Sequence, residues 1–147
     1  MNWLIENKRF GMTDLMVAID FEPKNDPLRY FIYSIGIDIL DYPKFLNSFS
    51  SSKSYYTHVS SLRFYKDLDW EDIEGLSKVG GIIEGEITIS HEVYGETVLK
   101  ESVFRQLIID YAGKLLEVYK NNSDLPDSWS EEMIVEINKL KNKLSDI

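Results

Sequence analysis

Hydrophobic and polar residues alternate with a period of two in four stretches of the chain. The clearest stretch covers residues 15–21, where every odd-numbered position is apolar, and the others cover residues 30–40, 59–65 and 83–93. Successive side chains of a strand point to opposite faces, so each stretch predicts a strand with one buried face. Because only a short connection with two prolines separates the first two stretches, we expect them to form an antiparallel pair.

Apolar residues recur every three or four positions towards the end of the chain, which is the spacing of a buried helix face. One stripe predicts a long helix that begins near Thr97 or near Ser102 and ends before Asn121. This stripe consists of Val103, Phe104, Leu107, Ile108, Tyr111, Ala112, Leu115, Leu116 and Tyr119. A second helix would open with a capping box formed by Ser128 and Glu131. Its narrower stripe consists of Met133, Ile137, Leu140, Leu144 and Ile147.

Two short helices are predicted between the strands. Pro43 favours the first turn of one, and we expect a serine-rich loop at residues 48–54 to end it. Asp69 is placed to cap the other, which Gly80 and Gly81 would terminate. Strands come first and two long helices come last, an order typical of an α+β domain. We therefore predict a single domain, residues 1–147, with helices packed on one face of an antiparallel sheet of about four strands.

The composition limits the chemistry that the chain can perform. It contains no cysteine, which excludes disulfide bonds, thiolate metal sites and thiol redox roles. Residues 1–9 lack the apolar stretch of a signal peptide, and no apolar run approaches the roughly 20 residues that cross a bilayer. We expect a soluble protein of the cytoplasm.

Most of the net negative charge lies in residues 67–101, which we call the acidic segment. It holds ten carboxylates and two lysines, and so carries eight of the nine net negative charges. Such a surface attracts a basic protein and repels nucleic acid and anionic membranes. Trp70 and Tyr94 lie among the acids, a composition typical of an interface hot spot. We expect the partner-binding residues to be Asp67, Asp69, Trp70, Glu71, Asp72, Glu74, Glu84, Glu86, Glu92 and Tyr94.

Candidate catalytic and metal-binding residues are few. His58 and His91 have no second histidine or cysteine at a ligand spacing, and the inward phase of His91 fits a core or sheet-end histidine that makes one hydrogen bond. Residues 67–72 have the oxygen spacing of a calcium loop but lack its glycine and its distal glutamate. Glu84 and Glu86 would lie about 7 Å apart on one strand face, but any acidic strand offers such a pair. With no phosphate-binding glycine loop and no hydrolase serine motif, we expect no catalytic site, metal or cofactor.

The chain resembles in type a known class of proteins. Its acidic run at residues 67–72, its acidic strand expected at residues 84–94, and its lack of a catalytic set are similar to those of the immunity proteins of bacterial toxin systems, including contact-dependent growth inhibition. The resemblance implies that the partner is the toxin domain of a cognate secreted effector, for example a nuclease. It also implies inhibition by occlusion of the toxin's active site.

Two alternatives remain open from the residues alone. The first is a small enzyme whose site is assembled by the fold and uses His58 or His91 with a carboxylate. It predicts a concave pocket that holds a histidine or a carboxylate with a strongly shifted pKa. The second is an adaptor or assembly subunit that uses the same acidic face without inhibiting its partner.

Overall fold

The computed structural model describes residues 1–10 and 14–145 of the chain. Its elements, in chain order, are β1 (Asn2–Phe10), β2 (Asp14–Glu22), α1 (Asp26–Gly36), α2 (Tyr42–Ser50), β3 (Tyr55–Tyr56), β4 (Ser60–Phe64), α3 (Trp70–Gly75), β5 (Glu86–His91), β6 (Gly95–Lys100), α4 (Glu101–Tyr119) and α5 (Asp127–Ser145). Short 3₁₀ turns are η1 (Ile39–Asp41), η2 (Tyr65–Asp67) and η3 (Leu76–Val79). The predicted α+β class is confirmed: an antiparallel four-stranded sheet is combined with helices, the last two of them long.

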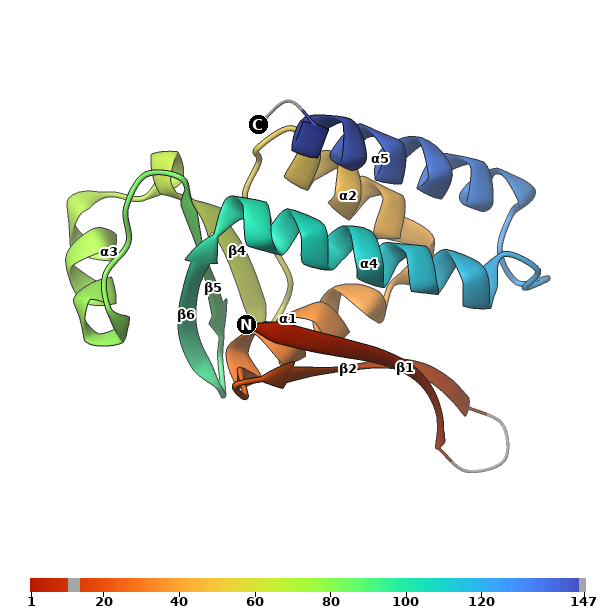
Figure 1. The fold of residues 1–147 in the computed structure, drawn as a ribbon, viewed down its shortest axis with the longest axis horizontal. Helices are drawn as coiled ribbons and strands as arrows, with labels where there is room; N and C mark the ends of the chain where they lie inside the picture. Colours follow the sequence, from red (N-terminus) through yellow and green to blue (C-terminus); the bar gives the residue numbers. More distant parts are fainter. Residues whose placement is uncertain (11–13, 146–147) are drawn as a thin grey trace.

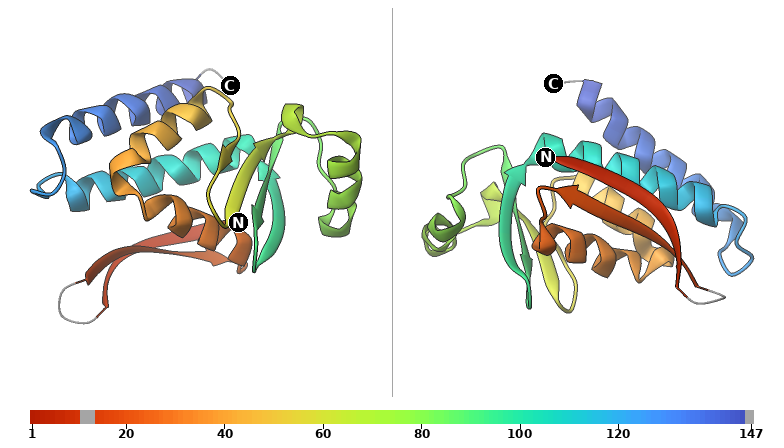
Figure 2. Two further views of the ribbon diagram at one scale, coloured as in Figure 1. Left: turned by 180° about the vertical axis from the view of Figure 1, so that it is seen from behind. Right: turned by 60° about the horizontal axis from the view of Figure 1, so that its bottom comes forward.

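The four-stranded sheet, in the order β3-β4-β5-β6, has helices on both sides (Figure 1). On one side lie α1, α2, α4 and α5, while the short α3 lies on the other. The β1–β2 hairpin forms a separate sheet that packs against α1 and α4 (Figure 2). The hydrophobic core fills the space between the larger group of helices, the hairpin and the inner face of the sheet. Trp129 of α5 is fully buried there, and its indole N–H donates to the carbonyl of Ile39 at 2.7 Å.

The strand predicted at residues 30–40 is wrong, because most of this stretch belongs to helix α1. Apolar and polar residues alternate in this stretch, but apolar residues also recur every three or four positions. The residues with the helical spacing pack into the core, and the stretch is therefore a helix. Its buried face consists of Leu28, Phe31, Ile32 and Ile35. Asn25 caps α1 by accepting a hydrogen bond from the backbone N–H of Leu28 at 3.3 Å, and Pro27 lies in the first turn. The predicted pairing of residues 15–21 with residues 30–40 is therefore wrong too, since β2 pairs with β1.

The strand predicted at residues 83–93 is shorter and forms β5 only. Its central isoleucines are buried as predicted, but the outermost apolar positions, Ile83 and Val93, are exposed. The predicted solvated acidic face is wrong, because Thr88 in the middle of that face is only 1% exposed. A further strand, β6, follows, and α4 begins directly after it at Glu101.

Three helix boundaries differ from their predictions. Helix α3 ends at Gly75, and the 3₁₀ turn η3 occupies the interval before Gly80, the predicted stop. Helix α5 begins at Asp127, so Ser128 lies inside its first turn and not at the cap position that a capping box requires. Helix α2 continues to Ser50, so the beginning of the predicted loop at residues 48–54 is helical. The first three positions of the α5 stripe are buried as predicted. Ile147 and the side chains of Leu144 and Leu15 lie outside the described part of the chain.

Candidate functional site

Helix α3 is held in place by hydrogen bonds that its own first turn supplies. Asp69 is the N-cap, as predicted, and its Oδ1 accepts from the backbone N–H of Asp72 at 2.8 Å. Asp72 completes a capping box, because its Oδ2 accepts from the backbone N–H of Asp69 at 3.1 Å. Arg63 of β4 lies 3.2 Å from the same oxygen. The hydrogen bond from the Asp69 backbone, together with the charge of Arg63, lowers the pKa of Asp72. The ion pair between Asp72 and Arg63 also connects the first turn of α3 to the sheet.

The side chains that α3 and the turn before it direct to solvent form a mixed acidic and aromatic patch. We call this patch the α3 surface, and it consists of Asp67, Trp70, Glu71 and Glu74. Trp70 is 70% exposed, and Glu74 lies one helical turn after it on the same side. Asp67 accepts a hydrogen bond from the hydroxyl of Ser54 at 2.7 Å. Within the described residues, neither Glu71 nor Glu74 forms an ion pair, so their charges face water.

The other predicted partner-binding residues lie elsewhere. Glu84 is in the turn before β5, whereas Glu86 is the first residue of β5, so the two do not share a strand face as predicted. Glu92 and Tyr94 are in the turn between β5 and β6. Tyr94 stacks on Tyr30 of α1, with ring centroids 4.0 Å apart. Since α1 and α3 lie on opposite sides of the sheet, the acidic segment does not present one continuous face (Figure 1).

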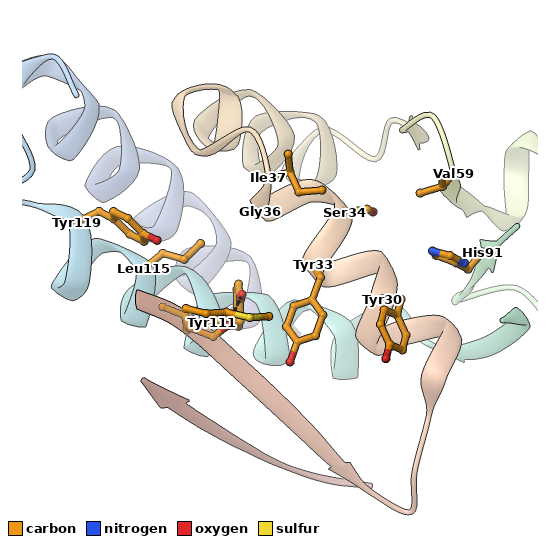
Figure 3. A pocket seen from close by; sticks show the side chains of 12 residues that line it. Tyr30, Tyr33, Ser34, Gly36, Ile37, Val59, His91, Tyr111, Leu115 and Tyr119 are labelled. Carbon is orange, nitrogen blue, oxygen red and sulfur yellow. Dashed lines mark hydrogen bonds between the residues drawn. The ribbon is translucent and has the colours of Figure 1, made fainter. Parts of the chain in front are cut away.

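A groove lies on the α1 side of the sheet. It contains two neighbouring depressions, of about 380 Å³ and about 540 Å³, which share Ser34, Ile37 and Val59 in their walls. Figure 3 shows the larger side chains of the first depression, with the α4 residues on one side of α1 and His91 on the other. Its tyrosines are Tyr30 and Tyr33 from α1 and Tyr111 and Tyr119 from α4. We call the two depressions together the tyrosine groove.

Two of these tyrosines have their hydroxyl groups hydrogen-bonded to the backbone of β2. Tyr111 donates to the carbonyl of Val17 at 2.8 Å. Tyr33 accepts from the backbone N–H of Ile19 at 3.0 Å and donates to the carbonyl of Ile19 at 3.2 Å. Burial raises the pKa of Tyr111 above its ordinary value of about 10, so this hydroxyl stays protonated and continues to donate further into the alkaline range than a free tyrosine. With their polar atoms engaged by β2, these rings contribute mainly apolar surface to the groove.

Each depression is also lined by polar side chains other than tyrosine: His91 in the first, and Asp38 and His58 in the second. His91 stands at the end of β5, the second of the two positions expected for it, and its Nδ1 accepts from the backbone N–H of Val93 at 3.1 Å. In the neutral ring the proton is therefore on Nε2, which has no hydrogen-bond partner among the described residues. The second depression is lined by Asp38 and His58 among others. In the described part of the chain, neither histidine is hydrogen-bonded to a carboxylate, the pairing that the enzymatic alternative invokes.

Sequence reasoning did not identify the tyrosine groove. The lining of the first depression is drawn from β2, α1, the turn before β4, the end of β5 and α4, so no local spacing connects its members. The enzymatic alternative, which places His58 or His91 in a concave pocket, was the sequence signal that pointed to this place, because each histidine lines one of the two depressions. Ile37 and Asp38 fall in a stretch where the sequence predicts a strand, which hid their position at the end of α1.

Comparison with known proteins adds no relative. No protein-family model, curated protein or solved structure matches this chain. None of the helices that the structure describes has the length and hydropathy needed to cross a membrane. Among the same residues there is no group of three or more histidine, cysteine, aspartate or glutamate side chains placed to hold a metal ion.

Proposed function

We propose that this protein binds a basic protein through the α3 surface and acts as an immunity protein that neutralises a cognate secreted toxin. The observation that carries the proposal is the environment of Trp70. This large side chain is 70% exposed on a capped helix, beside carboxylates that form no ion pair within the described residues. Exposed tryptophans in polar surroundings are typical of interface hot spots.

The chemistry of the α3 surface favours a cationic partner. Glu71 and Glu74 lie three positions apart on one helix, so their like charges repel each other in the unbound protein. A lysine or arginine from a partner would relieve this repulsion and could also lie over the face of the Trp70 ring. The net charge of −9 extends the attraction beyond the contact itself and speeds the encounter at low salt.

Occlusion of a cationic site would be sufficient for inhibition. A toxin that cleaves nucleic acid binds the phosphates of its substrate with lysine and arginine side chains. Carboxylates that occupy those side chains exclude the substrate, and the inhibitor performs no chemical step. The capping box of α3 supports this role, because a surface that is already ordered loses little conformational entropy on binding.

The first experiment is affinity purification of the tagged protein from its native cells at low and at high salt, with the recovered proteins identified by mass spectrometry. We expect one basic protein in near-stoichiometric amount, with recovery that falls as salt rises. Addition of this protein to an assay of the recovered partner's toxicity should then abolish the partner's activity. Recovery of no stoichiometric partner from cells that express the toxin would contradict the proposal.

A second experiment assigns the binding to α3. The double substitution Glu71→Gln with Glu74→Gln removes two charges and keeps the side-chain shapes, so association with the purified partner should slow and lose part of its salt dependence. The matched control is Glu131→Gln with Glu132→Gln, which removes two exposed charges from α5. If association slows equally in the control, then net charge alone sets the rate and the α3 surface is not the binding site.

A further inference from the structure

We propose that the tyrosine groove is a second docking site, which takes an extended segment of the basic partner protein. An apolar side chain of that segment enters the first depression, and a basic side chain lies against Asp38 in the second. The inference rests on the proposed function for the charge of the partner. It adds a second contact region, on the side of the sheet opposite α3.

The first depression is suited to an apolar group. Its volume of about 380 Å³ falls within the range of small-ligand pockets, and its walls are mainly aromatic and aliphatic. The hydroxyls of Tyr33 and Tyr111 are already bonded to β2 and demand no partner from a ligand. Ser34 is likewise engaged, with its Oγ 2.7 Å from both the carbonyl of Phe31 and the Oγ of Ser60. An apolar side chain can therefore enter without leaving a protein hydrogen bond broken.

One donor at the edge of this depression can bind the main chain of the segment. The Nδ1 of His91 already accepts from Val93, so the Nε2–H is the group that remains to donate. A peptide carbonyl is the acceptor that an extended segment always supplies, whatever its side chains. This arrangement gives one main-chain hydrogen bond next to one apolar pocket.

The second depression is suited to a basic side chain. Asp38 lines it, is exposed, and forms no ion pair among the described residues. No lysine or arginine of the described chain lines either depression. Ile37, which is 85% exposed, stands between the two depressions and offers apolar surface to the stem of a long side chain. The negative charge of Asp38 therefore favours a cation in the second depression. Because Ile37 lines both depressions, one extended segment can occupy the two together.

Fragment probes test the two depressions separately by nuclear magnetic resonance of the histidine rings. N-acetylphenylalanine amide should shift the His91 resonances with a Kd in roughly the millimolar range, as expected for a fragment of this size. Ethylguanidinium should shift the His58 resonances, and its neutral isostere ethylurea should not. The guanidinium shift should disappear in Asp38→Asn and persist in the control Asp124→Asn, an exposed acid in the turn between α4 and α5. Equal shifts from ethylurea would overturn the assignment of a basic side chain.

Linked probes test the single extended occupant. Short peptides with phenylalanine and arginine separated by one, two or three glycines should include one that shifts both histidines and binds at least about tenfold more tightly than either fragment. The variant Gly36→Leu should block this peptide, because a Cβ at Gly36 meets only the Tyr111 hydroxyl at 3.9 Å and the rest of the new side chain would enter the first depression. Failure of every peptide to exceed the fragments, or unchanged binding to folded Gly36→Leu, would overturn the proposal.

The two proposals fail in different ways. The substitution Glu71→Gln with Glu74→Gln should leave peptide binding to the groove unchanged. If the probes do not bind while partner association remains sensitive to Glu71 and Glu74, the groove inference falls and the proposed function stands. If the linked peptide binds but no basic partner is recovered from cells, the proposed function falls and the groove remains a site for a basic segment.

Discussion

The α3 surface and the tyrosine groove lie on opposite sides of the sheet and use their polar groups in opposite ways. At α3 the cap carboxylates bond to the helix backbone, while Glu71 and Glu74 keep their charges exposed to water. In the groove, the hydroxyls of Tyr33 and Tyr111 bond to β2, and the rings remain as lining. Charge acts over about 10 Å at ordinary ionic strength, whereas apolar contact requires close fit. On the proposed function, the α3 surface would attract the partner over a distance, and the tyrosine groove would select it by contact.

The sharpest test of this contrast is Trp70→Ala. If Trp70 is the hot spot that we propose, it should contribute at least about 2 kcal/mol to partner binding, which is a factor of about 30 in Kd. Global stability should not change, because the side chain is largely exposed. Surface plasmon resonance with the purified partner should show the loss mainly as faster dissociation. If this variant binds the partner as tightly as the original protein, Trp70 is not a hot spot, and only the carboxylates of the α3 surface could contribute to binding.

The next test concerns the architecture of the groove. Tyr111→Phe removes the donor to the Val17 carbonyl and should lower the free energy of unfolding by about 1 to 2 kcal/mol, measured by urea denaturation at neutral pH. Burial raises the pKa of Tyr111 in the folded state, so its contribution is present below the unfolded pKa of about 10 and is lost as pH rises further. The difference between the variant and the original protein should therefore narrow in alkaline solution. A constant difference would mean that the hydroxyl is not protected by folding.

A smaller effect, of opposite sign, is expected at Gly36. Alanine at this position meets only ordinary contact with Tyr111 and needs no unusual backbone conformation. Gly36→Ala should raise the free energy of unfolding by about 0.4 to 1 kcal/mol, because the unfolded chain loses conformational freedom. Thermal unfolding followed by circular dichroism measures it. If Gly36→Ala lowers the free energy of unfolding instead, the end of α1 does not have room for the added methyl group.

The smallest expected effect is at the α3 cap, and it depends on pH in the direction opposite to that of the groove. The hydrogen bond from Asp69 and the charge of Arg63 lower the pKa of Asp72 in the folded protein. Its contribution is therefore present above the unfolded pKa of about 3.9 and is lost as pH falls through the lower folded value. Asp72→Asn should reduce stability slightly at neutral pH, with the difference from the original protein disappearing in acid. Urea denaturation across the acid range measures this, and a difference that grows in acid would contradict it.

Structural features whose interacting residues lie close together in the sequence could be predicted. The cap of α3 joins residues three positions apart, and the stripe of α4 repeats within each turn, so backbone geometry alone sets those contacts. The β2 and β4 strands and the α+β class were predicted on the same basis. For the candidate site, Trp70, Glu71 and Glu74 were recognised from local composition, and the structure leaves them exposed together.

Other features were decided by the tertiary structure. Residues 30–40 carry both a strand-like and a helix-like spacing, and packing of the helical face into the core selected the helix. Tyr94 lies in the acidic segment but stacks on Tyr30 of α1, away from α3. The hydrogen bond from Tyr111 to Val17 joins residues 94 positions apart. The sequence by itself determined the strands β2 and β4, the long helix α4, the cap of α3 and the residues of the α3 surface. Only the fold could assemble the tyrosine groove, because contacts between distant residues depend on how all the elements pack at once.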